Sequence, residues 1–111
     1  MKLPADAIIA LEKMTGYLLA DRPRGDKSSF LAEAGYTMAN PDQLRRDLRE
    51  QVLPLNAAPL PPRGYGDMYE IRGILRGPNG VGLPVRTFWM RERATGLVKF
   101  ITLVPLRRER P

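Results

Sequence analysis

The feature of this sequence that most restricts its fold is a cluster of prolines and glycines near the middle of the chain: Pro54, Pro59, Pro61, Pro62, Gly64 and Gly66. Proline has a fixed φ and no backbone N–H, so neither a helix nor a central strand can run through the cluster. We therefore expect residues 54–66 to form an extended crossover. It is too short, and its flanks are too small, to separate two domains.

The whole chain is expected to form one domain, since 111 residues can bury a single core. Its expected parts are a helical part over 1–53, the crossover over 54–66, a sheet over 67–106 and a charged tail over 107–111.

The first predicted helix has apolar residues at helical spacing: Ile8, Leu11, Met14 and Leu18. Gly16 weakens the middle of this helix and favours a turn between two short pieces. Two further helices carry end signals. Asp26 can cap one of them, and Gly35 is placed to end it.

The last of these helices has the most complete set of signals. Asn40 can cap it, Pro41 suits its first position, and Gln43 stands where a capping-box partner belongs. Its apolar stripe consists of Leu44, Leu48 and Val52.

Three strands are expected after the crossover: Met68–Leu75, Val85–Arg91 and Leu97–Val104. The segment Gly77–Gly80 is a strong turn signal, and Thr95-Gly96 marks a second turn. The last strand is apolar on both faces except at Lys99 and Thr102, which is typical of a buried strand.

The separation of helices from strands along the chain predicts an α+β fold. We expect the N-terminal helices to pack on one face of an antiparallel meander of three or four strands. The other face would be open to solvent or to a ligand.

The charge is unevenly distributed. Residues 1–55 carry eight basic and eight acidic side chains, whereas residues 56–111 carry ten basic and four acidic ones and hold the whole excess of +6. Fourteen of the eighteen basic residues are Arg, whose planar fork suits phosphate or carboxylate. This favours a surface for a polyanion or an acidic protein, while solubility alone is the simpler explanation.

Several classes of site are excluded. The chain has no Cys and no His, so it lacks disulfides, thiolate chemistry, the usual general base and the commonest metal ligand. No cofactor and no metal are expected. The glycine-rich segment Gly77–Gly82 has no Lys-Ser/Thr after it and is interpreted as a hairpin turn. Asp67 and Glu70 have no dyad spacing, and we expect them to be exposed charges.

The N-terminus has no apolar leader, and no apolar run approaches the ~18 residues of a membrane span. We therefore expect a cytoplasmic protein of bacterial type, or a module delivered by another domain or partner, and no membrane partner.

One expected strand places Arg86 and Thr87 beside the only Trp, Trp89. In a regular strand Arg86 and Phe88 share one face, while Thr87 and Trp89 share the other. Arg86 and Thr87 can therefore line one site only if a bulge intervenes. Thr102 can join Thr87, depending on the register.

Five segments of the chain resemble the signature of a family of small, uncharacterised bacterial domains: EKMTGYLL at 12–19, GDKSSF at 25–30, Gly35-Tyr36, VRTFW at 85–89 and FITLVP at 100–105. Members of that family resemble toxin modules and are encoded beside small acidic proteins or at the ends of larger polymorphic toxins. Their layout is similar to that of the barnase–EndoU–colicin–RelE group of ribonucleases, which is an analogy at the level of fold.

The resemblance implies a set of site residues: Lys27, Arg86, Thr87, Trp89 and Thr102. The sequence departs from the family pattern in two places. The segment before Lys27, where relatives often carry a His, has Arg22-Pro23-Arg24-Gly25 here, and Leu103 is bulkier than its counterparts. The missing His weakens the expectation of an active enzyme.

Cleavage of RNA by its own 2′-hydroxyl needs a base, a cation beside the phosphorane and an acid at the leaving 5′ oxygen. Without His, the candidate proton carriers are Tyr17, Tyr65, Tyr69 and Lys27.

The candidate site residues are assigned separate roles. Arg86 is assigned to the phosphate because Arg stays charged. Lys27 is assigned to proton transfer or phosphate contact, and Thr87 and Thr102 to hydrogen bonding. Trp89 is assigned to base stacking or to the core, and the core is favoured because a lone Trp in a strand is usually packed.

Three functions remain open beside an unrelated role for a basic domain. The first is a toxin-like, metal-independent ribonuclease neutralised by a small acidic partner of the antitoxin or immunity type. The second is a non-catalytic module that binds an acidic protein or nucleic acid through several arginines: Arg72, Arg76, Arg86, Arg91 and Arg93. The third is a toxin that degrades NAD⁺.

Overall fold

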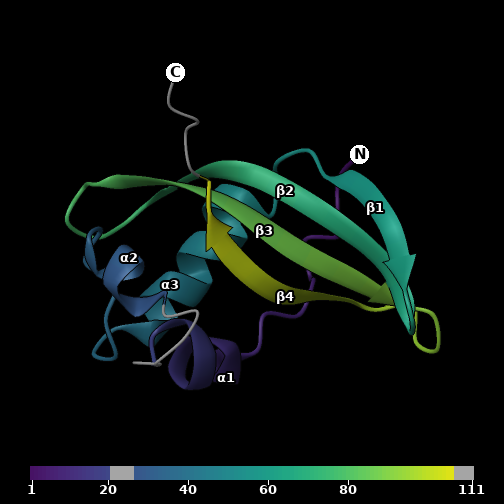
Figure 1. The fold of residues 1–111 in the computed structure, drawn as a ribbon, viewed down its shortest axis with the longest axis horizontal. Helices are drawn as coiled ribbons and strands as arrows, with labels where there is room; N and C mark the ends of the chain where they lie inside the picture. Colours follow the sequence, from purple (N-terminus) through teal and green to yellow (C-terminus); the bar gives the residue numbers. More distant parts are fainter. Residues whose placement is uncertain (21–26, 107–111) are drawn as a thin grey trace.

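The computed structural model of the protein describes residues 1–20 and 27–106. It has an α+β fold, with short helices in the N-terminal half and a four-stranded antiparallel sheet in the C-terminal half (Figure 1). The predicted fold class is confirmed. In the two described ranges, no helix is long and apolar enough to cross a membrane. The expected cap at Asp26, the segment 22–25 and the charged tail lie outside the described residues.

The first helix begins later than its apolar spacing predicts. The α1 helix covers only Leu11–Lys13, and a π-helix, η1, continues it over Met14–Leu18. Ile8 instead pairs with the last strand: its N–H donates to the Val98 carbonyl at 2.8 Å. This pairing covers part of a sheet edge, which overrides the helical periodicity of the segment. Gly16, expected at a turn, lies inside η1.

The other helices follow their sequence signals more closely. The α2 helix covers Ser28–Ala32, and Gly35 follows it with a φ of 93°, as expected for a helix end. The α3 helix covers Pro41–Asp47 and continues as a π-helix, η2, over Leu48–Val52. All three residues of the predicted apolar stripe are buried: Leu44, Leu48 and Val52.

The predicted position of the α3 cap is confirmed, but its predicted hydrogen bonds are wrong. Asn40 is the N-cap residue, but its side chain makes no cap hydrogen bond. Its Oδ1 accepts from the Thr37 N–H at 2.8 Å, and its Nδ2 donates to the Gly35 carbonyl at 2.9 Å. The amide therefore holds the turn before α3, because Asn side chains compete for nearby backbone groups. Gln43 donates to Asp47 and does not form a capping box.

The sheet has four strands in the order β1-β2-β3-β4: β1 Ala58–Arg63, β2 Gly66–Arg76, β3 Gly82–Glu92 and β4 Val98–Pro105. Residues 54–66, expected as a crossover, thus contain a strand. β1 tolerates its prolines because it lies at the edge of the sheet, where one side of its backbone needs no strand partner.

The two faces of the sheet differ in burial, as the alternation in β3 predicts. Val85, Thr87 and Trp89 are fully buried on the face that the helices cover. There the Trp89 and Phe100 rings meet edge to face, with centroids 5.3 Å apart. Arg86 and Phe88 lie half-buried on the opposite face. We call this second face, which carries Arg72, Arg86, Phe88 and Thr102, the open face.

A β-bulge in β4 sets the position of Thr102. Phe88 pairs with Thr102 while its neighbour Trp89 pairs with Phe100, so Ile101 is the extra residue. Regular alternation from Phe100 would point Thr102 into the core, and the bulge reverses that pattern. The register that would bring Thr102 beside Thr87 is therefore not the one that forms. The cross-strand partner of Thr87 is Leu103.

Candidate active site

Three elements bring Lys27, Tyr17 and Thr102 together at the β4 edge of the sheet. Lys27 precedes α2, Tyr17 belongs to η1, and Thr102 belongs to β4. The Lys27 Nζ donates to the Tyr17 Oη at 2.6 Å. The Tyr17 Oη and the Thr102 Oγ1 share a hydrogen bond of 3.0 Å. The phenol oxygen is thus held between an ammonium group and a hydroxyl group.

The surroundings of Tyr17 make its phenol more acidic. The hydrogen bond from Lys27 lowers the pKa of Tyr17 below the ordinary value of 10, and the hydrogen bond with Thr102 lowers it further. Burial opposes this change in pKa, but the positive charges of Lys27 and Lys13 add to it. Both hydrogen bonds and both charges stabilise the phenolate. A phenol in this position gives up its proton more readily than an exposed tyrosine.

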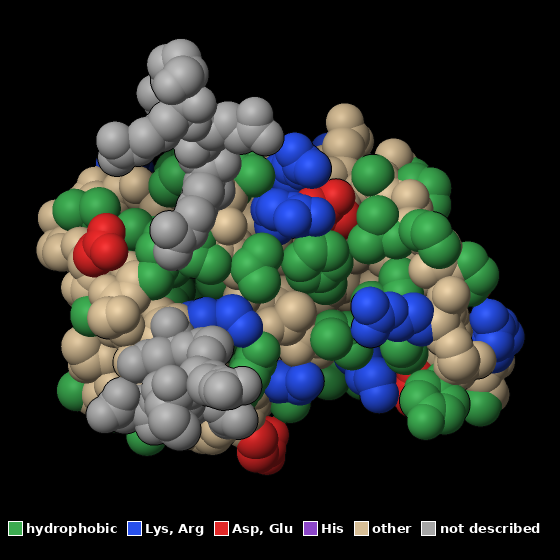
Figure 2. All heavy atoms as spheres, in the orientation of Figure 1, with side chains coloured by type: hydrophobic (Ala, Val, Ile, Leu, Met, Phe, Trp, Pro, Cys, Tyr) green, Lys and Arg blue, Asp and Glu red, His purple; other side chains and the backbone are tan. Residues whose placement is uncertain are grey.

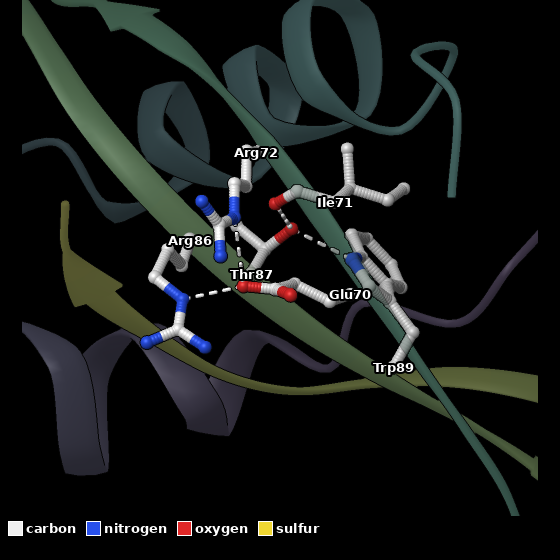
Figure 3. A network of polar contacts seen from close by, with 6 residues as sticks. All are labelled: Glu70, Ile71, Arg72, Arg86, Thr87 and Trp89. Carbon is white, nitrogen blue, oxygen red and sulfur yellow. Dashed lines mark hydrogen bonds and ion pairs between the residues drawn. The ribbon is translucent and has the colours of Figure 1, made fainter. Parts of the chain in front are cut away.

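A second cluster lies on the open face of β2 and β3. The Glu70 carboxylate accepts hydrogen bonds from Arg86 and, at 3.2 Å, from Arg72 (Figure 3). Burial alone would raise the pKa of Glu70, but the two guanidinium groups outweigh it and lower the pKa below 4.5. Glu70 is therefore an ionised carboxylate at neutral pH. Arg72 and Arg86 keep 60% and 36% of their side chains exposed, so both retain donors for a ligand.

The sheet register relates the two clusters. Glu70 pairs with Phe88, and Phe88 pairs with Thr102, so the three lie in one row across β2, β3 and β4. Neighbouring strands are about 4.8 Å apart, which puts the backbones of Glu70 and Thr102 about 10 Å apart. The Arg86 guanidinium lies 5.1 Å from the centre of the Phe88 ring and so leans over this row. A carboxylate and a phenol thus flank an arginine and an aromatic ring.

Two of the predicted site residues lie on the other side of the sheet. Thr87 is fully buried, donates to the Ile71 carbonyl at 3.0 Å and accepts from the Trp89 Nε1 at 2.8 Å (Figure 3). Trp89 is also fully buried, in agreement with the preference for the core. The structure therefore brings Lys27, Arg86 and Thr102 to one region and leaves Thr87 and Trp89 in the core.

The remaining predicted arginines are held by turns. Arg76 donates to the Gly80 carbonyl, Arg91 to the Gly96 carbonyl and Arg93 to the Gly64 carbonyl. Arg72 alone among the other binding candidates touches the Glu70 cluster. Figure 2 shows the side of the molecule that is seen in Figure 1. On this side, basic side chains are spread among hydrophobic ones, and few acidic side chains are visible.

Sequence reasoning missed Glu70 and placed Tyr17 only among several proton carriers. Glu70 is 8% exposed, so the expectation of an exposed charge was wrong. Its position two residues before Arg72 in a strand puts both side chains on one face, and that spacing is the signal that could have identified the pair. Tyr17 has no such signal, because its partners are distant in the sequence.

The described residues contain no cluster of three acidic side chains that would suit a metal ion. The arrangement supplies instead a lowered-pKa phenol, an ionised carboxylate and two exposed guanidinium groups.

A family model for a domain of unknown function, DUF6883, matches residues 2–107. The chain belongs to the DUF6883 family. The expected membership of an uncharacterised domain family is thus confirmed, and the family description assigns no activity. No curated protein and no solved structure matches the chain.

Proposed function

We propose that this DUF6883 domain is a toxin-like ribonuclease that cleaves RNA on the open face without a metal ion. The observation that supports this most is the row from Glu70 to Thr102, which ends at Tyr17 and has Arg86 above it. Cleavage by the 2′-hydroxyl needs a base and an acid on opposite sides of the phosphate, with positive charge between them. The row has these three groups in that order.

In the proposed reaction Glu70 accepts the proton of the 2′-hydroxyl. The 2′ oxygen attacks the phosphorus, and the bond from the phosphorus to the 5′ oxygen breaks. Tyr17 donates its proton to the departing 5′ oxygen. The products are a 2′,3′-cyclic phosphate and a 5′-hydroxyl, and water returns the Glu70 proton to the Tyr17 phenolate.

The cations support two different stages of this reaction. Arg86 and Arg72 face the phosphate, where their permanent charge stabilises the additional negative charge of the phosphorane. Lys27 stabilises the Tyr17 phenolate that proton donation leaves behind, through the 2.6 Å hydrogen bond. The proposed roles of Arg86 and Thr102 thus keep the sequence-based assignments. Lys27 changes its role from proton transfer or phosphate contact to support of the phenolate, Tyr17 is selected from the four candidate proton carriers, and Glu70 is new.

A small acidic partner fits the same proposal. A carboxylate-rich surface over Lys27, Arg72 and Arg86 would pair with these cations and exclude RNA from the row. Binding of an acidic protein without catalysis is the alternative function, and it would use the same arginines.

The test is cleavage of a fluorescent oligoribonucleotide in the presence of EDTA. Wild type is expected to release a 2′,3′-cyclic phosphate, and Tyr17→Phe and Glu70→Gln are each expected to slow cleavage by roughly 10²- to 10⁴-fold. Tyr65→Phe is the matched control, because Tyr65 is 80% exposed and distant from the row in the sheet register.

Three outcomes would contradict the ribonuclease. Equal cleavage by wild type and Tyr17→Phe would show a contaminating nuclease. RNA binding without cleavage, with graded losses at each arginine, would support the binding module, and consumption of NAD⁺ in place of RNA would support a nucleotide-degrading toxin.

A further inference from the structure

The open face carries a hollow that adjoins the catalytic row and shares Phe88 and Thr102 with it. Its volume is about 480 Å³, and it lies between β1 and β4, above β2 and β3. Its lining is mostly apolar and comes from all four strands: Leu60, Pro61, Pro62, Met68, Phe88 and Ile101. Arg63 and Thr102 complete the lining. The irregular pairing of β1 between Leu60 and Arg63 marks the place where β1 borders the hollow.

We infer that this hollow holds one nucleobase of the RNA, and so sets base preference at the cleavage site. A nucleobase has apolar faces and a polar edge, and the hollow combines an apolar lining with the polar side chains of Thr102 and Arg63. The volume lies within the range of roughly 300–1,000 Å³ of small-molecule sites. Aromatic rings such as that of Phe88 are the usual platforms for stacked bases.

The position of the hollow favours a nucleotide over a purely apolar occupant. Phe88 and Thr102 belong both to the hollow and to the catalytic row, so the occupant lies beside Arg86. An apolar peptide side chain would gain nothing from Arg86 or Arg63, whereas a nucleotide brings an anionic phosphate to them. The inference rests on the proposed function for the identity of the polymer, but the binding of a base can be measured without cleavage.

The test compares two ligands that carry the same phosphate. Adenosine 5′-monophosphate has a base, ribose 5-phosphate has none, and neither has an internucleotide bond to cleave. Titration calorimetry on the whole chain is expected to show about tenfold tighter binding of the nucleotide, since base stacking contributes ~1–3 kcal/mol and about 1.4 kcal/mol corresponds to a factor of ten.

Two variants fill the hollow from β1: Leu60→Trp and Pro62→Trp. Each is expected to remove the tenfold advantage of the nucleotide while leaving ribose 5-phosphate binding unchanged. Pro62 is exposed, so its variant keeps the test valid if Leu60→Trp fails to fold. The control is Ile74→Trp, at a 53% exposed position on the open face that does not line the hollow.

Equal affinity for the two ligands, no measurable binding of either, or an advantage that survives both filling variants would overturn the inference. Base-dependent binding by a protein that cleaves no RNA would overturn the ribonuclease but keep the nucleobase site. RNA cleavage with no base-dependent binding would overturn the nucleobase site but keep the ribonuclease.

Discussion

At the scale of single residues, the acidity of Tyr17 is set by its neighbours. Its phenol oxygen has an ammonium donor at 2.6 Å and a hydroxyl group at 3.0 Å. The chain has four tyrosines, and the pKa values of two of them, Tyr17 and Tyr36, are shifted in opposite directions. Tyr65 is exposed, whereas burial and the hydrogen bond to Asp47 raise the pKa of Tyr36.

We expect one tyrosine to ionise below pH 10 when phenolate absorbance is followed against pH, because the Lys27 hydrogen bond lowers the pKa of Tyr17. Lys27→Met should raise this transition towards 10, and Tyr17→Phe should remove it. An early transition that persists in Tyr17→Phe would assign the effect to another residue.

The lowered pKa of Glu70 leads to a second prediction, which concerns stability at acid pH. Its folded pKa is below the unfolded value of about 4.5, so the native state binds fewer protons than the unfolded state in this range. The stability that Glu70 contributes is therefore present above pH 4.5 and is lost as the pH falls through the lowered pKa. Urea unfolding at a series of pH values should show that the free energy of unfolding falls less steeply towards acid pH for Glu70→Gln than for wild type. Glu33→Gln, at an exposed position, should leave the steeper wild-type loss intact.

At the scale of elements, close backbone contacts decide how the hairpin between β2 and β3 meets α2. A Cβ at Gly77 would lie 2.0 Å from the Ala34 carbonyl oxygen. The Asn79 N–H donates to the same oxygen at 3.3 Å, so the turn packs directly on the end of α2.

Gly77→Ala is expected to lower the free energy of unfolding by about 2–3 kcal/mol, because the backbone of Ala34 cannot yield as a side chain can. Gly16→Ala is the control, because it makes the same substitution where there is space. A Cβ at Gly16 meets nothing within 4 Å, and alanine favours the helical backbone, so we expect the free energy of unfolding to rise by about 0.5–1 kcal/mol. Chemical denaturation of both variants checks the pair, and a neutral Gly77→Ala would contradict the close packing.

The elements also show how far the sequence predicts this molecule. The strand faces of Arg86 and Trp89 followed from a period of two, and the end of α2 followed from Gly35. The bulge at Ile101 could not be predicted, because a strand that is apolar on both faces shows no change in its hydrophobic pattern when the register shifts by one residue. The sequence therefore left the face of Thr102, and with it the contact between Thr102 and Tyr17, undetermined.

At the scale of the whole molecule, the proposed binding of RNA would depend on how many of its phosphates lie beside a cation. Arg72 and Arg86 face the open row, while Arg91 and Arg93 are bonded to turns. We expect only the first pair to contribute strongly to the salt dependence of binding.

The affinity of an inactive Tyr17→Phe protein for single-stranded RNA should fall steeply with salt. Adding Arg72→Gln should reduce the slope of log affinity against log salt by about 0.7, the value for one lost phosphate contact on a single strand. Adding Arg93→Gln should leave the slope nearly unchanged. Equal reductions for both would indicate diffuse attraction over the whole surface.

The contact between Tyr17 and Thr102 joins positions 85 apart in the sequence. Ile8 likewise pairs with Lys99, so an N-terminal segment and β4 form a β-bridge with each other. Contacts between residues so far apart in the sequence require the long intervening loop to close, which costs entropy. A nascent chain on the ribosome therefore has no assembled phenol site until β4 has emerged and paired. If the domain is the ribonuclease that we propose, this order of events would delay RNA cleavage until synthesis of the domain is essentially finished.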